Sequence, residues 1–315
     1  LAEFRAVCDE YGAVQIGEGP MTTVNSAMKY LSGDTKSMDM MFSFDHMMAD
    51  CLFTEYFHRP FSLIRLKTAL SRWQYKLADK AWNSLYLENH DHPRVISRYG
   101  SEKYHRESGT ALATAYMVLK GTPFIYQGQE IGMTNIALPS IDDYKDCMAI
   151  KNYNNDIQKK PVEEVLPKIQ KATRDNARTP VQWSKDAYGG FSTTQPWFAV
   201  NPNYTTINVA SQEQDPDSLL NFYRKLIAFR TKSPVVRYGS YQELCPHNKH
   251  LYVYEREYEG EGLLVVCSFT DKPCTYHLPK KVREGNVKVL FSNYNCDDLE
   301  PTFTTKPYEV RVYQY

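Results

Sequence analysis

Two acidic positions in this sequence could carry out general acid and base chemistry. Glu18 lies between two glycines after a short apolar run, and Asp91 follows the Asn89-His90 pair 73 residues later. Cleaving a glycosidic bond needs one carboxyl that protonates the leaving oxygen and one carboxylate that stabilises positive charge at the anomeric carbon. The planar guanidinium of Arg174 could hold such a carboxylate or a sugar hydroxyl. Residue types alone leave a plainer interpretation open for each: a solvated strand end, a turn and a salt-bridged loop.

The segments around these residues predict strand–helix units of a parallel sheet, because apolar runs, polar clusters and helical patterns alternate. The expected strands and helices are strands over 13–17, 38–44, 84–87 and 123–126 and helices over 62–75 and 107–119. β/α barrels place their active sites at the carboxyl ends of the strands, so Glu18 and Asp91 are expected at one mouth. Four units are half of a complete barrel. The predicted fold class is therefore α/β, the C-terminal half of a (β/α)8 TIM barrel followed by an all-β antiparallel sandwich domain.

The sequence pattern changes near residue 235, and we predict a boundary between two domains at this point. Residues 1–235 form the partial catalytic barrel, with about four strands and a long polar insertion after the last one. Residues 236–315 form the C-terminal β-sandwich domain, because short strands separated by turn residues recur every eight to twelve residues. Its expected strands are 238–244, 251–257, 263–268, 274–278, 287–291 and 309–313.

The composition excludes several classes of function. Lys plus Arg and Asp plus Glu each number 37, so no basic excess predicts nucleic-acid or membrane binding. The seven cysteines form no C-x-x-C pair, and no leader is visible, which favours the cytoplasm and predicts neither disulfides nor a metal site. Aromatic residues make up 13% of the chain. They could fill the core, or they could stack on the C–H faces of sugar rings.

Three long motifs resemble the α-amylase superfamily, glycoside hydrolase family 13. They are Glu-Asn-His-Asp-His-Pro-Arg at 88–94, the Gly-Thr-Pro-Phe-Ile-Tyr-Gln-Gly run at 121–133 and Arg-Asp-Asn-Ala-Arg-Thr-Pro-Val-Gln-Trp at 174–183. The oligo-1,6-glucosidase and α-glucosidase branch is the most similar one, over nearly the whole chain. The resemblance implies a retaining glycoside hydrolase of carbohydrate metabolism that releases terminal α-linked glucose from small oligosaccharides.

The resemblance also implies a role for individual residues. Glu18 matches the general acid/base, and Asp91 matches the carboxylate that stabilises the transition state. His90 and Arg174 match residues that bind the cleaved glucose. His92 stands where close relatives often carry Gln, so we expect it to bind substrate at the mouth. Two further expectations concern other positions: Arg178, Gln127 and Glu130 should be structural, and Met148 should replace a carboxylate that contacts the second sugar.

The family's nucleophile is the Asp of a Gly-Phe-Arg-x-Asp motif, and these 315 residues contain no such motif. We therefore expect no nucleophile in this chain, a missing N-terminal half-barrel as its partner, and no hydrolysis by the chain alone. No cofactor is expected, although calcium could bind the missing half. Three alternatives remain open: a non-catalytic interaction subunit of the same superfamily, a sucrose-isomerising or transglucosylating relative, and carbohydrate binding by the C-terminal domain.

Overall fold

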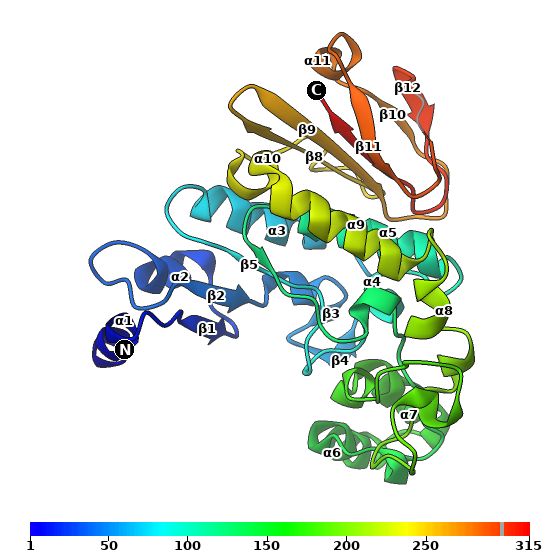
Figure 1. The fold of residues 1–315 in the computed structure, drawn as a ribbon. Helices are drawn as coiled ribbons and strands as arrows, with labels where there is room; N and C mark the ends of the chain where they lie inside the picture. The colour runs from blue at the N-terminus through cyan, green and yellow to red at the C-terminus, as the bar shows by residue number, and fades with distance from the viewer. Residues whose placement is uncertain (297–298) are drawn as a thin grey trace.

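The structure is a computed structural model that describes residues 1–296 and 299–315 (Figure 1). Four short strands form the inner wall of its first part. They are β1 (Ile16–Gly19), β2 (Met40–Ser43), β5 (Ser84–Leu85) and β6 (Thr122–Pro123). β1 pairs in parallel with β2, and β5 pairs in parallel with β6. Side chains join the two pairs, because the Tyr86 hydroxyl donates to the Ser43 carbonyl at 2.9 Å. The parallel β/α units predicted from the sequence are thus confirmed.

Helices cover the outside of these strands, as their apolar faces require. Ser62 caps the helix after β2, since its hydroxyl accepts from the Arg65 amide. The helix over 105–117 is buried from Ser108 to Met117, and the small residues Gly109, Ala111, Ala113 and Ala115 within it allow close packing. The helices of this part are α1 (Ala2–Glu10), α2 (Val24–Leu31), α3 (Leu63–Leu77), α4 (Val95–Tyr99), α5 (His105–Met117), α9 (Leu219–Lys232) and α10 (Pro234–Tyr238). A small hairpin, β3 (Cys51–Leu52) with β4 (Thr54–His58), follows β2.

The long polar segment after β6 builds a small core of its own. It contains α6 (Cys147–Asp156), α7 (Val162–Ala172) and α8 (Val209–Glu213). Single turns of 3₁₀ helix lie between them, among them Arg174–Ala177, Ala187–Gly190 and Pro202–Thr205. Its buried apolar residues are Ile136, Leu138, Tyr144, Ala149, Val165, Ile169 and Phe198. The segment lies at the opposite end of the molecule from the C-terminal sheet (Figure 1).

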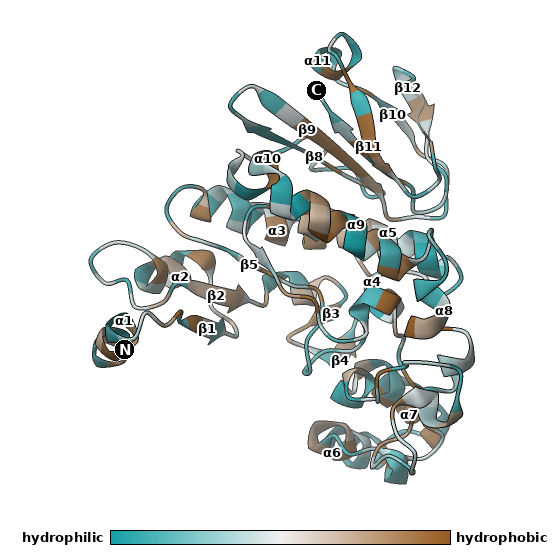
Figure 2. Cartoon of the chain, viewed as in Figure 1, coloured by the Kyte–Doolittle hydropathy of each residue, from teal (hydrophilic) through white to brown (hydrophobic). Residues whose placement is uncertain are grey.

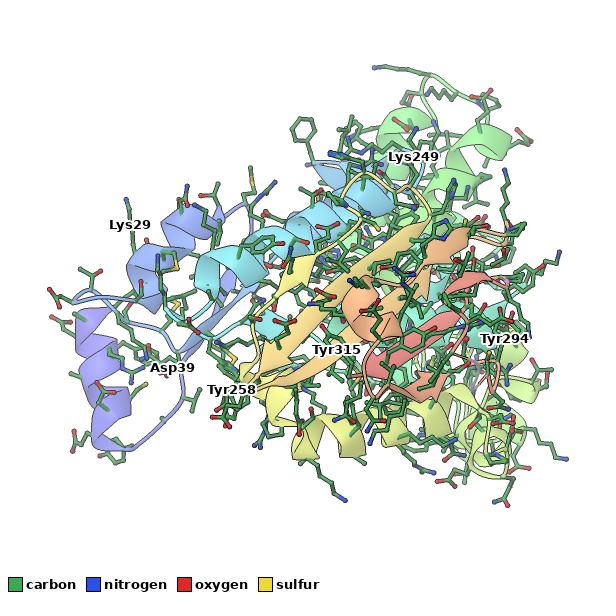
Figure 3. The ribbon with its side chains drawn as sticks, turned by 90° about the horizontal axis from the view of Figure 1, so that it is seen from above. Lys29, Asp39, Lys249, Tyr258, Tyr294 and Tyr315 are labelled. Atoms are coloured by element: carbon green, nitrogen blue, oxygen red, sulfur yellow. The ribbon has the colours of Figure 1, made fainter. Side chains whose placement is uncertain are left out.

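The C-terminal part is an antiparallel sandwich. Five strands form a sheet in the order β11-β13-β9-β8-β7, and β10 pairs with β12. The strands are β7 (Gln242–Glu243), β8 (Leu251–Tyr258), β9 (Glu261–Ser268), β10 (Thr275–His277), β11 (Lys288–Ser292), β12 (Thr302–Thr304) and β13 (Val310–Gln314), with the short helix α11 (Lys280–Arg283) between β10 and β11. Figure 2 shows the apolar run along β9. In the view of Figure 3, Tyr258 and Tyr315 belong to this sheet, whereas Lys29 and Asp39 belong to the N-terminal units.

The two faces of the five-stranded sheet pack against different elements, as alternating residues of β8 show. Val253 and Leu251 pack toward β10 and β12, while Tyr252 and Tyr254 join the core formed with α3, α5 and α9. The Tyr254 hydroxyl donates to the carbonyl of Thr114 in α5 at 3.3 Å. The helices therefore lie between the sheet and the parallel strands (Figure 1). Helix α10 crosses the predicted boundary at 235/236, and that division stays a proposal.

Several predicted elements differ from the structure in length or position. The first strand starts three residues later than expected, so Glu18 lies within β1 instead of beyond its end. The third and fourth strands keep only two residues each, β5 and β6. Residues 238–244 start in a helix, α10, and only two of them are strand, β7. The predictions missed β12, because a single apolar side chain, Phe303, marks it.

Candidate active site

The Glu18 side chain extends from β1 into an open cavity of about 360 Å³. In the parallel register Glu18 lies opposite Phe42 of β2. The cavity wall is aromatic, with Phe42, Tyr86 and Phe124 on it, and His90 stands at the same cavity. Burial raises the pKa of the Tyr86 phenol, and the nearby Glu18 carboxylate raises it further. Glu18 therefore carries its carboxyl on the inner wall of the strands, which is where barrel chemistry takes place.

The glycines beside Glu18 make room for packing on the far side of the strand. Gly17 and Gly19 are both buried. A Cβ on Gly17 would lie 2.2 Å from the sulfur of Met38, and one on Gly19 would lie 2.7 Å from the sulfur of Met41. Since strand side chains alternate, the two glycines face the helix side while Glu18 faces the cavity. Their absent side chains make room for the methionines that pack against α2 and α3.

Asp91 lies in the loop after β5, where three side chains surround its carboxylate. Arg178 Nη2 donates to Oδ1 at 3.0 Å, and Arg174 Nη1 lies 3.5 Å from the same oxygen. His90 Nε2 is 3.3 Å from Oδ2. The Asp91 amide donates to the Asn89 side chain at 2.8 Å, which closes a local turn. The carboxylate remains one-third exposed, so a ligand can still reach it.

Arg174 is fixed by a second carboxylate, that of Asp146. Arg174 Nε and Nη2 donate to Asp146 Oδ1 at 3.0 and 2.7 Å, and the Arg174 amide donates to Oδ2 at 3.1 Å. Burial alone would raise the pKa of Asp146, but the bonds from Arg174 lower it below the usual value. Asp146 also caps α6 by accepting from the Met148 amide. The forked contact orients the remaining nitrogen of Arg174 toward Asp91.

Arg178 belongs to the same cluster, although we expected it to be structural. Its Nε donates to the carbonyl of His90 at 3.1 Å, and its Nη2 donates to Asp91. Arg178 therefore holds both the backbone and the side chain of the His90-Asp91 pair. The sequence offered a weak signal: Arg174 and Arg178 are four positions apart, at the start of a 3₁₀ turn and directly after it, but this spacing does not tell which arginine faces a neighbouring loop.

His92 lies away from this cluster, which corrects the expectation that it lines the mouth. It is 6% exposed, and its Nδ1 lies 2.5 Å from Glu55 Oε1. Arg98 Nη1 contacts the same oxygen at 3.3 Å. Burial raises the pKa of Glu55, but His92 and Arg98 bring it below the usual value. The carboxylate of β4 draws the imidazole inward, because a buried charge needs close partners.

A buried ion pair supports the Asp91 loop from below. Glu88 Oε2 accepts from Arg94 Nη1 at 3.0 Å, and the same nitrogen donates to the Gln127 carbonyl at 2.8 Å. The other nitrogens of Arg94 contact the carbonyls of Asn176 and Ala177. Burial raises the pKa of Glu88, and Arg94 opposes this rise. Arg94 thus ties three loops together behind the site.

The other residues singled out in the sequence take peripheral positions. Gln127 contributes its backbone carbonyl to Arg94. Met148 lies exposed in the first turn of α6. The described residues contain no group of three or more His, Cys, Asp or Glu side chains that could hold a metal ion. In the same part of the chain, none of the helices combines the length and apolar character of a membrane span.

Two family models together match almost the whole chain. The model described as "Alpha amylase, catalytic domain" matches residues 1–239, and "Maltogenic Amylase, C-terminal domain" matches residues 241–312. The chain belongs to the alpha-amylase family.

Curated relatives and solved structures agree with this membership. An oligo-1,6-glucosidase of Bacillus cereus is 40% identical over 314 residues, which are 98% of this chain and 56% of the relative. A trehalose-6-phosphate hydrolase of Bacillus subtilis (strain 168) is 36% identical, again over 98% of this chain and 56% of the relative. The chain therefore spans just over half the length of the curated relatives it matches.

The crystal structure of Bacillus licheniformis trehalose-6-phosphate hydrolase matches with a TM-score of 0.92 at 36% identity, covering 97% of this chain and 56% of that one. The isomaltulose synthase from Klebsiella sp. LX3 matches with a TM-score of 0.92 at 31% identity, covering 99% and 57%. The family resemblance and the fold class expected from the motifs are confirmed.

Proposed function

We propose that this chain supplies the acid/base half of a retaining α-glucosidase active site of the oligo-1,6-glucosidase kind. One observation carries the proposal: Asp91 is held by two guanidiniums beside His90, and His90 stands at the same cavity as Glu18. Two carboxyl groups in different surroundings near one aromatic-walled cavity suit glycosidic cleavage. The homologous oligo-1,6-glucosidases support the substrate class, small oligosaccharides with terminal α-linked glucose.

In this proposal each residue has a distinct role. Glu18 protonates the leaving oxygen and then activates water as the base. Asp91 binds hydroxyls of the reacting glucose and stabilises the positive charge that develops at the ring. Its oxygens have capacity left, because the two arginines occupy mainly Oδ1. His90 and Arg174 donate to the same sugar. In this proposal His92 does not contact the substrate; it positions the loop through its contact with Glu55.

The nucleophile is proposed to come from an N-terminal half-barrel, because these residues contain no Gly-Phe-Arg-x-Asp motif. The purified chain alone should then release no glucose from isomaltose or p-nitrophenyl α-glucoside. No cofactor is proposed for this half, and any calcium site would lie on the other one. We also propose a cytoplasmic location and a role in carbohydrate metabolism; the cysteine pattern of the sequence, which has no C-x-x-C pair, supports the location.

The test is Glu18→Gln in the complete protein. The rate on p-nitrophenyl α-glucoside should fall by about 10²–10⁴-fold, since general acid catalysis contributes that much. Glu213→Gln, which changes an exposed carboxylate of α8 paired with Arg224, is the matched control. An unchanged rate for Glu18→Gln would refute the assigned role, whereas a complete parent protein without any rate would favour the alternative of a non-catalytic subunit.

A second candidate is isomerisation of sucrose. The similarity to the isomaltulose synthase structure favours it over other transfer reactions. Both reactions form a glucosyl intermediate, and they differ in whether water or the released fructose attacks it. Incubating the complete protein with sucrose and separating the products decides between them: free glucose and fructose indicate hydrolysis, and isomeric disaccharides indicate transfer.

A further inference from the structure

A second hollow lies in the segment that follows β6, apart from the cavity that holds Glu18. Its volume is about 890 Å³. Aromatic and polar side chains share its lining, chiefly Tyr188, Trp197, Tyr204, Gln195, Asp143 and Lys145. Neither the acid/base pair nor the Asp91 cluster uses any of these side chains. The aromatic residues of the sequence could fill the core or stack on sugar rings. The rings of this hollow fit the stacking alternative.

The indole of Trp197 faces solvent while the ring that supports it is buried. Trp197 is 73% exposed, although large aromatic side chains are highly buried on average. Its neighbour Phe198 is 2% exposed and meets it edge-on with ring centroids 5.5 Å apart. Phe198 belongs to the small core of this segment, with Leu138 and Ile169. The exposed indole thus packs on an aromatic ring that belongs to a buried apolar core.

Tyr188 is presented by a tight turn that its own side chain does not favour. Its φ is 55° and ψ 28°, a left-handed conformation that is uncommon for bulky residues. Gly189 and Gly190 follow with φ of 67° and 66°. The Gly189 amide donates to the Asp186 carbonyl at 2.9 Å, and the Trp183 amide donates to the Gly189 carbonyl at 2.7 Å. The turn therefore fixes the tyrosine ring at the rim of the hollow, where a smaller residue would fold more easily.

The polar lining complements the rings. Asp143, Lys145 and Gln195 are exposed, so a carboxylate, an ammonium group and an amide lie in the same hollow as the aromatic rings. A pyranose offers the matching surfaces: C–H groups on its faces that pack on aromatic rings, and hydroxyls at its edge that hydrogen-bond to carboxylate, ammonium and amide groups. A purely apolar partner would leave these polar groups without hydrogen bonds, which disfavours it.

We propose that this hollow is a second carbohydrate site, which binds α-linked gluco-oligosaccharides without cleaving them. The proposal rests on the proposed function for the identity of the sugar. Lys145 directly precedes Asp146, which holds Arg174 at the Asp91 cluster, so the two sites are joined by a short stretch of chain. A longer saccharide held here would be retained by the protein independently of the bond-cleaving site.

The test measures binding separately from cleavage. We expect the complete protein to be retarded by dextran, an α-1,6-linked glucan, in native gel electrophoresis. Trp197→Ala should lower the apparent affinity for dextran by about 10-fold or more, since loss of a central aromatic contact commonly costs above 1 kcal/mol and 1.4 kcal/mol is tenfold. Tyr188→Asn removes the second ring and keeps a residue that tolerates a positive φ, so it guards against misfolding of the first variant.

Trp183→Ala is the matched control, because Trp183 is 52% exposed but does not line the hollow. Its retardation should equal that of the parent chain. Equal retardation of the parent, Trp197→Ala and Tyr188→Asn would overturn the proposal, as would a parent that dextran does not retard. Retardation lost in both variants, in a complete protein that hydrolyses no α-glucoside, would keep this site and reject the proposed function instead.

Discussion

At the scale of single residues, the site depends on how a carboxylate is kept both bound and available. Asp91 is paired with Arg178 at 3.0 Å on one oxygen and approached by His90 at 3.3 Å on the other. Arg174 donates to the buried carboxylate of Asp146 with Nε and Nη2, and only its Nη1 lies near Asp91. Arg178 holds the Asp91 carboxylate, whereas Arg174 is held by Asp146 and points one nitrogen at Asp91. Substitutions of the two arginines should therefore have different effects on activity.

Arg178→Ala in the complete protein should lower kcat/KM on p-nitrophenyl α-glucoside by about 10- to 100-fold. A hydrogen bond to a charged group contributes about 1.5–3 kcal/mol, and each 1.36 kcal/mol is tenfold in rate. Arg178→Lys should recover only part of the loss, because an ammonium cannot contact Asp91 and the His90 carbonyl as a fork. Arg224→Ala, which removes an exposed arginine paired with Glu213, should leave the rate unchanged. Wild-type kinetics in Arg178→Ala would return this residue to a purely structural role.

Substitution of His92 should change the free energy of unfolding and not the substrate specificity. His92→Ala removes the 2.5 Å partner of buried Glu55 and leaves this carboxylate with the 3.3 Å contact to Arg98; we expect a cost of about 1–3 kcal/mol for the lost bond. We expect that loss in the free energy of unfolding measured in urea. His92→Gln restores a donor and should recover most of it. If His92→Gln instead changes the relative rates on isomaltose and maltose at unchanged stability, the side chain contacts substrate after all.

At the scale of elements, the sequence predicted helices better than strands. The helices expected over 62–75 and 107–119 match α3 and α5 to within two residues at each end, because a helix face repeats over many turns. The barrel strands were harder: β5 and β6 form only two residues of ladder each, so polar loop residues follow sooner than the apolar runs suggest. Asp91 and Arg174 were found through motifs. Arg178 and the Glu55–His92 pair were not, since their partners are 87 and 37 residues away and no local spacing encodes such contacts.

The contact between α6 and the Arg174–Ala177 turn should respond to pH in a defined direction. Hydrogen bonds from Arg174 lower the pKa of Asp146 below its unfolded value of 3.8, despite burial. A depressed carboxyl pKa stabilises the fold above the unfolded pKa, and that stability is lost as pH falls through the folded pKa. Asp146→Asn should therefore be clearly destabilising at pH 7 and much less so near pH 2. Urea unfolding at both pH values tests this, with the exposed Asp156→Asn of α6 as the control. Equal destabilisation at both would mean that the ionised form gives no advantage.

At the scale of the whole molecule, the sandwich and the β/α units share one core. Residues of α3, α5 and α9 pack in a single cluster with inward residues of β8, β9 and β13. Lys67 of α3 is fully buried and donates to the Leu251 carbonyl of β8 at 3.1 Å. A cluster that spans both parts predicts cooperative unfolding, with no separate transition for the sheet.

Two buried arginines strengthen this junction by using the end of α5. Arg256 of β8 donates to the carbonyls of Val118, Gly239 and Ser240 at 2.6–2.7 Å, and Arg230 of α9 donates to those of Met117 and Leu119. The last carbonyls of a helix lack partners within it and carry its negative end, so they suit a guanidinium. Burial lowers the pKa of Arg256 to about 10, and the neighbouring Arg230 adds to this effect.

Arg256→Met keeps an unbranched apolar stem but removes the donors to three carbonyls, of which those of Val118 and Gly239 are buried. We expect the free energy of unfolding to fall by at least about 1–3 kcal/mol, the cost of one such group. Arg283→Met on exposed α11 should change it by no more than about 0.5 kcal/mol. Calorimetry adds the sharper criterion. If the junction is what makes the two parts unfold together, the parent shows one transition and Arg256→Met either keeps one at a lower temperature or splits it so that the sheet melts first. Two transitions already present in the parent would mean that the shared apolar cluster is too weak to couple them, and that the arginines stabilise only their own side of the junction.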